Sequence, residues 1–183
     1  MAQGNARVLC LQTQKEPEMM SVNVVDKFVR QFKSSLKLDE SFLTEKDGRY
    51  FFLNEKLKKL IRREFYYAGV YLGKQKERTF FPSFELLALI TENEANKTIV
   101  EQKTAWLFIC GRDVFKQGIK KVLGSKRRGD YTLILNERGE GLGFGKILSD
   151  LDETKKGVAI KNVSDIGDFL RRETRKQSKT SQF

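Results

Sequence analysis

The sequence predicts an α+β fold in which a small antiparallel sheet covered by helices is followed by a strand-dominated barrel with a basic rim. Three observations predict it. Apolar residues recur every three or four positions over 21–38. An Asp-Gly pair separates two β-prone runs within 42–53. Three short β-rich runs then follow one another within 131–163.

The N-terminal half is expected to be a helix-covered α/β sheet. Residues 1–19 show neither helical nor strand periodicity and are expected to be a mobile extension. Patterning begins directly after Met19 and Met20, so either is an alternative start to Met1. The stripe over 21–38 predicts a helix that packs on the sheet. Asp47-Gly48 predicts a hairpin, because its turn needs positive φ at both central residues.

Helices and strands alternate after this hairpin. Asn54 is placed to cap a helix that runs to about Tyr67 and has a basic outer face, which is either solvated or an RNA contact. Strands are expected over 69–73 and 79–82 and a helix over 83–92. The polar stretch 92–97 is the expected boundary between domains 1–94 and 95–183.

The second domain is expected to consist mainly of strands. A short helix capped by Asp113 interrupts them, and a polar, basic tail follows over 174–183. The expected strands span 98–100, 105–110, 131–135, 142–148 and 157–163.

The apolar run 106–110 is interpreted as buried. Trp106 and Phe108 then belong to the core, the alternative being a surface on which they stack on bases. Cys110 is expected to behave as a small buried hydrophobe.

Glycine recurs at every second position from 139 to 145, which in a strand clears one whole face of side chains. Something must approach that backbone closely: a neighbouring helix or strand of the same barrel, or a nucleic-acid backbone. A phosphate loop of the Walker type is excluded, because Glu140 stands where it needs glycine and Ile147 where it needs Ser or Thr.

The net charge of +11 favours a polyanionic partner, either nucleic acid or an acidic membrane surface. Residues 95–183 hold 19 Lys/Arg against 11 Asp/Glu, a net of +8, so the C-terminal half carries most of the net positive charge. No apolar stretch approaches the roughly 18 residues of a membrane span, and the start lacks the hydrophobic region of a signal peptide. A cytoplasmic protein is therefore expected.

Catalytic chemistry has little support in the sequence. Histidine is absent, which removes the usual general base and metal ligand. Asp165 and Asp168 share one face of a closing turn, where helix capping explains them better than acid–base chemistry. We therefore expect no enzyme, no metal and no cofactor.

Two basic sets are plausible phosphate contacts. One runs from Lys120 to Arg128. The other lies near the closing strand and turn, and consists of Lys155, Lys156, Lys161, Arg171, Arg172, Arg175 and Lys176. Single-stranded or loop RNA is favoured over duplex DNA, because no recognition helix with base-reading side chains on one face can be picked out.

Three stretches of the second domain are distinctive. They are WLFICGRDVF (106–115), NERGEGLGFGK (136–146) and GVAIKNVSDIGDFLRRE (157–173). They resemble the PUA domain, the RNA-binding module of pseudouridine synthases and archaeosine transglycosylases. With the preceding 90 or so residues, the chain resembles the Nip-seven family of ribosome-biogenesis factors in its archaeal form. The resemblance covers about 20–175 and is strongest after Lys103.

This resemblance implies a PUA pseudo-barrel over 95–183 and a non-catalytic role in large-subunit pre-rRNA maturation. The PUA half would hold RNA, and the N-terminal half would contact other assembly factors or the preribosome. The alternative is an accessory RNA-targeting subunit of an RNA-modification enzyme. The resemblance implies the following RNA-binding residues: Lys120, Lys121, Gly143, Lys161, Arg171, Arg172, Arg175 and Lys176.

Overall fold

The computed structural model describes residues 24–61, 65–153 and 155–168. The expected mobile extension 1–19 and the basic tail 174–183 lie outside these ranges. None of the helices in the described part is long and apolar enough to cross a membrane.

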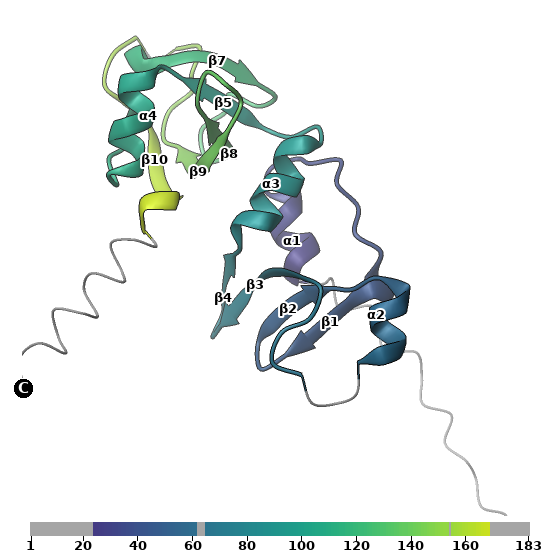
Figure 1. The fold of residues 1–183 in the computed structure, drawn as a ribbon. Coiled ribbons are helices and arrows are strands. Elements are labelled where there is room, and N and C mark those ends of the chain that lie inside the picture. Colours follow the sequence, from purple (N-terminus) through teal and green to yellow (C-terminus); the bar gives the residue numbers. More distant parts are fainter. Residues whose placement is uncertain (1–23, 62–64, 154, 169–183) are drawn as a thin grey trace, which may run out of the picture.

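Two sheets and four α-helices make up the described chain (Figure 1). The helices are α1 (Val24–Arg30), α2 (Glu55–Leu60), α3 (Phe84–Glu92) and α4 (Gln102–Ile109). The first sheet has the order β1 (Leu43–Lys46), β2 (Arg49–Phe52), β3 (Val70–Lys76), β4 (Thr79–Pro82). The second sheet contains β5 (Lys97–Val100), β6 (Val114–Phe115), β7 (Ile119–Leu123), β8 (Tyr131–Leu135), β9 (Gly141–Ile147) and β10 (Val158–Asp165).

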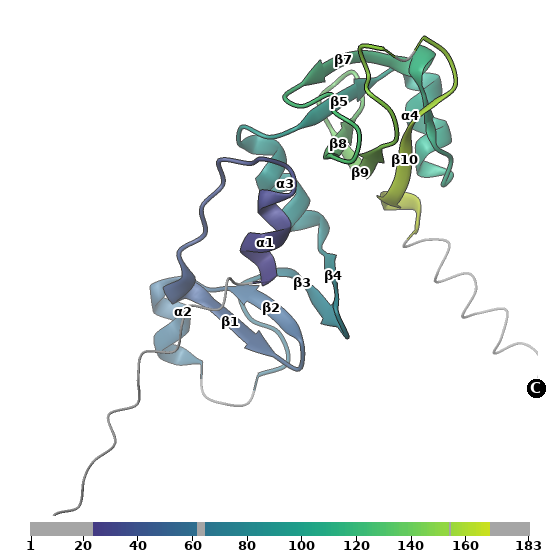
Figure 2. The ribbon, with the colours of Figure 1, turned by 180° about the vertical axis from the view of Figure 1, so that it is seen from behind.

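Helices α1 and α3 lie between the two sheets (Figures 1 and 2). One hydrophobic core joins the three layers: Phe28 of α1, Phe32 of the turn after it and Leu72 of β3 pack in the same cluster as Leu133 and Phe144 of the second sheet. Each fully buried Phe or Leu side chain contributes roughly 1.5–3 kcal/mol. The division into domains 1–94 and 95–183 stays a prediction, while the core shows that α1 and α3 pack against both sheets.

Local signals in the N-terminal half are confirmed where they depend on turn and cap chemistry. Asp47 and Gly48 have φ of 53° and 72° and join β1 to β2. The Asn54 side chain accepts a 2.8 Å hydrogen bond from the Leu57 N–H. The Ser83 hydroxyl does the same for the Leu86 N–H at 3.1 Å and begins α3.

Two predicted helices are shorter than expected. The stripe over 21–38 is helical only to Arg30, because the chain then turns through Lys33 (φ 51°). Beyond this turn, the Ser35 N–H bonds to the Glu94 carbonyl, a tertiary contact in place of a helical one. Helix α2 ends at Leu60 rather than near Tyr67.

The second sheet curls into a barrel. Its order is β6-β10-β9-β8-β5-β7, and its two outermost strands are consecutive in the chain, joined by the 3-10 turn Lys116–Gly118. Its interior is a second core that includes Val100, Phe108, Ile134 and Ile160. The predicted α+β class is confirmed, and β8, β9 and β10 match their predicted strands to within two residues.

The prediction of a strand over 105–110 is wrong, because this run belongs to α4. A helical period turns Thr104, Ala105 and Phe108 toward the barrel and leaves Trp106 64% exposed. The core interpretation is therefore right for Phe108 and wrong for Trp106. Cys110 is exposed, not buried.

The predicted helix after Asp113 is also wrong. Val114 and Phe115 form the short strand β6, which pairs with β10. Asp113 holds this arrangement instead of capping a helix: its carboxylate accepts a 2.8 Å hydrogen bond from the Asn162 N–H of β10.

Candidate nucleic-acid interface

Parts of the two basic sets lie on neighbouring loops: Lys126 to Arg128 on 124–130 after β7, and Lys155 and Lys156 on 148–157 after β9. The Leu151 N–H donates to the Lys126 carbonyl at 3.0 Å, and Lys126 Nζ forms a 2.7 Å ion pair with Asp152. Lys116 also donates to the Leu151 carbonyl. We call the exposed cations of these loops the basic loop surface: Lys126, Arg127, Arg128, Lys155 and Lys156.

A buried amide fixes the first of these loops. Asn96 is 2% exposed; its Oδ1 accepts from the Ser125 N–H at 2.8 Å and its Nδ2 donates to the Tyr131 carbonyl at 3.1 Å. Gly124 (φ 83°) lies so close that an added Cβ would be 2.5 Å from Asn96 Oδ1. The loop is therefore held at its base while its arginines stay exposed.

Asp130 closes the same loop. It accepts hydrogen bonds from Lys33 Nζ, at 2.7 Å, and from the Ser125 hydroxyl. The Lys33 hydrogen bond, followed by that of Ser125, lowers the pKa of Asp130 below its ordinary value. This carboxylate thus stays charged and joins the turn after α1 to the loop.

The cations differ in how far they are already neutralised. Lys120 pairs with Glu137 at 2.7 Å, and this contact lowers the pKa of Glu137. Exposed pairs of this kind contribute only about 0–1 kcal/mol, so a phosphate can compete for the cation. No carboxylate of a described residue lies within ion-pair distance of the remaining exposed cations Lys121, Arg127, Arg128, Lys155, Lys156 and Lys161.

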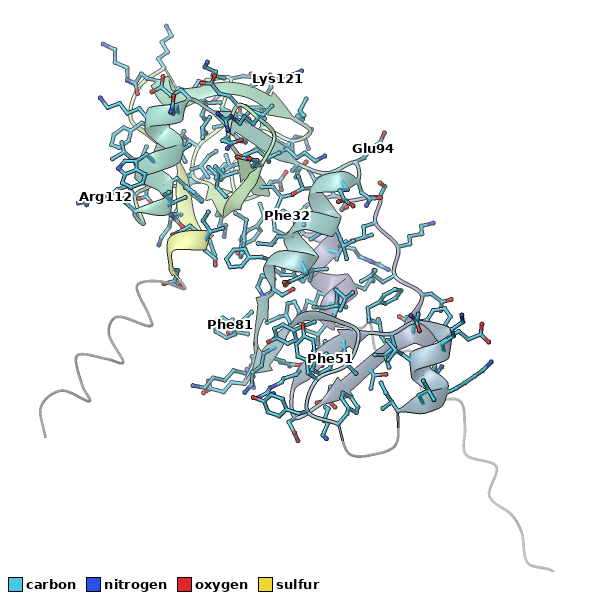
Figure 3. The ribbon with its side chains drawn as sticks, in the orientation of Figure 1. Phe32, Phe51, Phe81, Glu94, Arg112 and Lys121 are labelled. Carbon is cyan, nitrogen blue, oxygen red and sulfur yellow. The ribbon has the colours of Figure 1, made fainter. Side chains whose placement is uncertain are left out.

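An open cleft of about 750 Å³ adjoins the loop where the two halves of the chain meet. The cleft is lined by three cations, Lys33, Lys97 and Arg127, and by the carboxylate of Glu94. Figure 3 shows Glu94 at this junction and Lys121 on the adjacent β7. Arg127 belongs to both the cleft and the basic loop surface, so the two adjoin each other.

The structure places the predicted site residues in different settings. Lys120 and Lys121 are exposed on β7, and Lys161 is exposed on β10, where it pairs with Lys146 of β9. Gly143 is buried. The predicted residues Arg171, Arg172, Arg175 and Lys176 lie outside the described part of the chain.

The glycine-cleared face is approached closely by the protein's own chain. At Gly143 an added Cβ would lie 2.1 Å from the Ser164 carbonyl oxygen of β10, and at Gly145 it would lie 2.6 Å from that of Lys161. Gly141 faces Thr91 of α3 at 3.6 Å, whereas nothing lies within 4 Å at Gly139. Of the two expected neighbours, the barrel's own strand accounts for Gly143 and Gly145.

Sequence reasoning missed four exposed apolar side chains of the second domain. Trp106 and Leu107 of α4, Phe115 of β6 and Val163 of β10 are all exposed. Reading 102–109 with a helical period, which Thr104, Ala105 and Phe108 support, would have placed Trp106 on the surface.

The carboxylates of the closing turn act in capping. Asp165 is buried, and its Oδ1 accepts from the Asp168 N–H at 3.0 Å while its Oδ2 accepts from Asn162 Nδ2 at 3.1 Å. The expected capping role is confirmed for Asp165. Within the described ranges, no group of three His, Cys, Asp or Glu residues could hold a metal ion.

Comparison with known proteins gives the class of the second half. Residues 96–174 match the family model of the UPF0113 PUA domain, and this range contains α4 and all six strands of the second sheet. A UPF0113 protein from Archaeoglobus fulgidus is 30% identical over 112 residues, or 58% of this chain and 62% of that protein. The match thus spans less than two thirds of that relative's length.

Solved structures with partial likeness include two archaeal proteins. A conserved PUA domain protein from Thermoplasma acidophilum is 21% identical, with a TM-score of 0.49 over 72% of this chain and 79% of that one. A hypothetical protein from Pyrococcus horikoshii is 18% identical, with a TM-score of 0.47 over 72% and 77%. Both scores lie below 0.5, so the fold described above rests on the chain's own contacts.

Proposed function

We propose that this protein is a non-catalytic RNA-binding factor of the Nip-seven type that acts in the cytoplasm in large-subunit pre-rRNA maturation. PUA domains as a class bind RNA, and residues 96–174 match one. The observation that carries the proposal is that the loop with Lys126, Arg127 and Arg128 lies beside the loop with Lys155 and Lys156. The Lys126–Asp152 ion pair and the Leu151–Lys126 hydrogen bond join the two loops.

Binding is electrostatic in this proposal. Each Lys or Arg that neutralises a phosphate releases a counterion, so affinity falls with salt. The cations with no carboxylate of a described residue within ion-pair distance, Lys121, Arg127 and Arg128, contact the phosphates first. The exposed ring of Trp106 is available to stack on an unpaired base, which favours single-stranded or loop RNA.

The N-terminal half contacts another assembly factor or the preribosome itself. No residue of either half is assigned a catalytic role. Recovery of an RNA-modification enzyme with the tagged protein would favour the alternative, an accessory subunit that targets such an enzyme to RNA.

The test is binding of a uridine-rich single-stranded RNA over a salt series. The Arg127→Ala, Arg128→Ala and the Arg171→Ala, Arg172→Ala double variants should each weaken binding. Each should also flatten the log-log salt slope by about 1.4, taking about 0.7 per lost phosphate contact. Lys27→Ala, Lys37→Ala removes equal charge from exposed positions near α1 and should leave the slope unchanged. If all three double variants weakened binding and flattened the salt slope equally, RNA would bind through the overall charge of the protein and not through the proposed surface.

A further inference from the structure

We propose that the outer face of the first sheet, the face turned away from α1 and α3, is a second site for single-stranded RNA. It would hold phosphates on a row of cations and stack bases on exposed tyrosines. This inference rests on the proposed function only for the identity of the ligand, because the site lies on the other half of the chain.

Strand register places three cations in one row. Lys46 of β1 pairs with Arg49 of β2, and Arg49 pairs with Lys74 of β3. Lys74 in turn pairs with Phe81 of β4, which Figure 3 shows on that strand. Neighbouring strands are about 4.8 Å apart, so the three cations lie within about 10 Å across the sheet.

The alternation of side chains fixes which face this row occupies. Tyr50, Phe52 and Leu72 pack into the core with α1 and α3, whereas Phe51 and Tyr71 belong to a separate cluster on the opposite face. Arg49 alternates with Tyr50 and therefore shares the face of Phe51. Helix α2 covers the Phe51 end of this face through Leu57, and the row of cations lies at the other end.

Exposed aromatic rings border the row. Tyr66 and Tyr67 are 81% and 59% exposed. The Arg49 guanidinium lies 5.0 Å from the centroid of the Tyr66 ring, and Lys46 Nζ lies 4.9 Å from that of Phe65. The Tyr67 ring meets Phe51 edge-on at 5.5 Å. Arg49 therefore covers one face of the Tyr66 ring, while Phe51 meets Tyr67 at an edge. Both tyrosine rings remain largely exposed and have surface to offer a base.

A hollow of about 500 Å³ adjoins these cations and rings, and it is lined by Lys46, Asp47, Arg49, Phe65 and Tyr66. Binding sites for small molecules have volumes in this range. The hollow therefore has room for one base beside Tyr66 with its phosphate toward Arg49.

The charge of the face favours RNA as its occupant. No carboxylate of a described residue lies within ion-pair distance of Lys46, Arg49 or Lys74. A groove that combines unneutralised cations with exposed aromatic rings is the arrangement by which proteins bind single strands without sequence preference, through stacking and cation–π contacts.

The first measurement is stoichiometry. The full chain is titrated with a uridine-rich RNA of about eight nucleotides, short enough to fill one site. Wild type should bind two RNAs, and Arg49→Gln, Lys74→Gln should bind one while keeping its fold by circular dichroism. The glutamines keep much of each side chain's apolar stem and remove only the charge. One RNA bound by wild type, with affinity unchanged in this variant, would overturn the inference.

Aromatic stacking is tested separately. Tyr66→Ala, Tyr67→Ala should weaken the N-terminal site about fivefold or more with little change of salt slope, whereas Tyr66→Phe, Tyr67→Phe keeps both rings and should bind as wild type. Photocrosslinking of 4-thiouridine RNA should label the tryptic peptide 64–74 in wild type. RNA binding that is unaffected in all these variants, with a protein captured on this face instead, would also contradict the inference.

The outcomes separate this inference from the proposed function. If only the Arg127→Ala, Arg128→Ala pair loses an RNA, the proposed function stands and the second site is wrong. If only the Arg49→Gln, Lys74→Gln pair loses one, the second site stands and the assignment of RNA to the basic loop surface is wrong. Absence of any RNA binding by wild type contradicts both.

Discussion

The ring of Phe32, in the turn after α1, meets the ring of Phe144 on β9 edge-on, with the two centroids 5.6 Å apart. Phe28 approaches Phe144 at the same distance, and both contacts join residues more than 110 positions apart in the sequence. The single core across α1, α3 and both sheets implies that the two halves of the chain stabilise each other.

Phe144→Ala is therefore expected to destabilise the whole protein and not only the barrel. A buried Phe→Ala change costs about 3–5 kcal/mol. Unfolding in urea, followed by far-ultraviolet circular dichroism and by fluorescence of the single tryptophan, should give one coincident transition at a lower midpoint. Phe81→Ala, at a half-exposed ring on β4, should cost less than about 1 kcal/mol. Two separate transitions in wild type would contradict the shared core.

Asp130 should make stability depend on pH in the acid range. Its pKa is lowered in the folded state, first by Lys33 and then by Ser125. Its stabilising contribution is therefore present above the ordinary value of 3.8 and is lost as the pH falls through the lower folded pKa. The difference in unfolding free energy between wild type and Asp130→Asn should be largest at neutral pH and shrink below about pH 4.

The matching control removes the cation. In Lys33→Ala, the pKa of Asp130 measured by nuclear magnetic resonance should rise toward its ordinary value. An unchanged pKa would mean that Ser125 and the remaining positive field, not the ion pair to α1, hold the carboxylate charged.

Gly143 should not accept a side chain. Its φ of 143° is unfavourable for other residues, and a Cβ would lie 2.1 Å from the Ser164 carbonyl oxygen and 2.7 Å from Asp165 Cα. Gly143→Ala should destabilise the fold by more than about 3 kcal/mol in chemical denaturation. Gly139→Ala meets nothing within 4 Å and should cost only the strain of positive φ, about 1–2 kcal/mol. Similar losses in the two variants would show that strand packing at Gly143 is not the cause.

The sequence predicts the fold best where local chemistry decides it. The turn at Asp47-Gly48 needs positive φ and the cap at Asn54 needs a side-chain acceptor, and both follow from residue type. The end of α1 at Arg30 does not follow from residue type, because the segment beyond it bonds to residues near 94–96. The Asn96 N–H, for example, donates to the Phe32 carbonyl. A contact over more than 60 residues leaves no local trace.

The candidate site is predictable in composition but not in arrangement. The two basic sets stand out in the sequence, yet the approach of Lys155 and Lys156 to the first set depends on how the β7–β8 and β9–β10 loops fold beside each other, joined by the Lys126–Asp152 ion pair. The row Lys46, Arg49 and Lys74 depends on register across three strands. The Asp47-Gly48 turn fixes the pairing of Lys46 with Arg49, but no spacing in the sequence reports the pairing of Arg49 with Lys74.

Trp106 and Phe108 offer a direct test of the corrected segment. A helix over 102–109 buries Phe108 fully and leaves Trp106 largely exposed, whereas neighbours at i and i+2 of a strand would share one face. Phe108→Ala should therefore cost about 3–5 kcal/mol of unfolding free energy, and Trp106→Ala less than about 1 kcal/mol. Acrylamide should quench the single tryptophan readily in the folded protein. If RNA stacks on this ring, quenching should fall when RNA is added; protection in the free protein would instead restore the buried interpretation and remove Trp106 from the proposed surface.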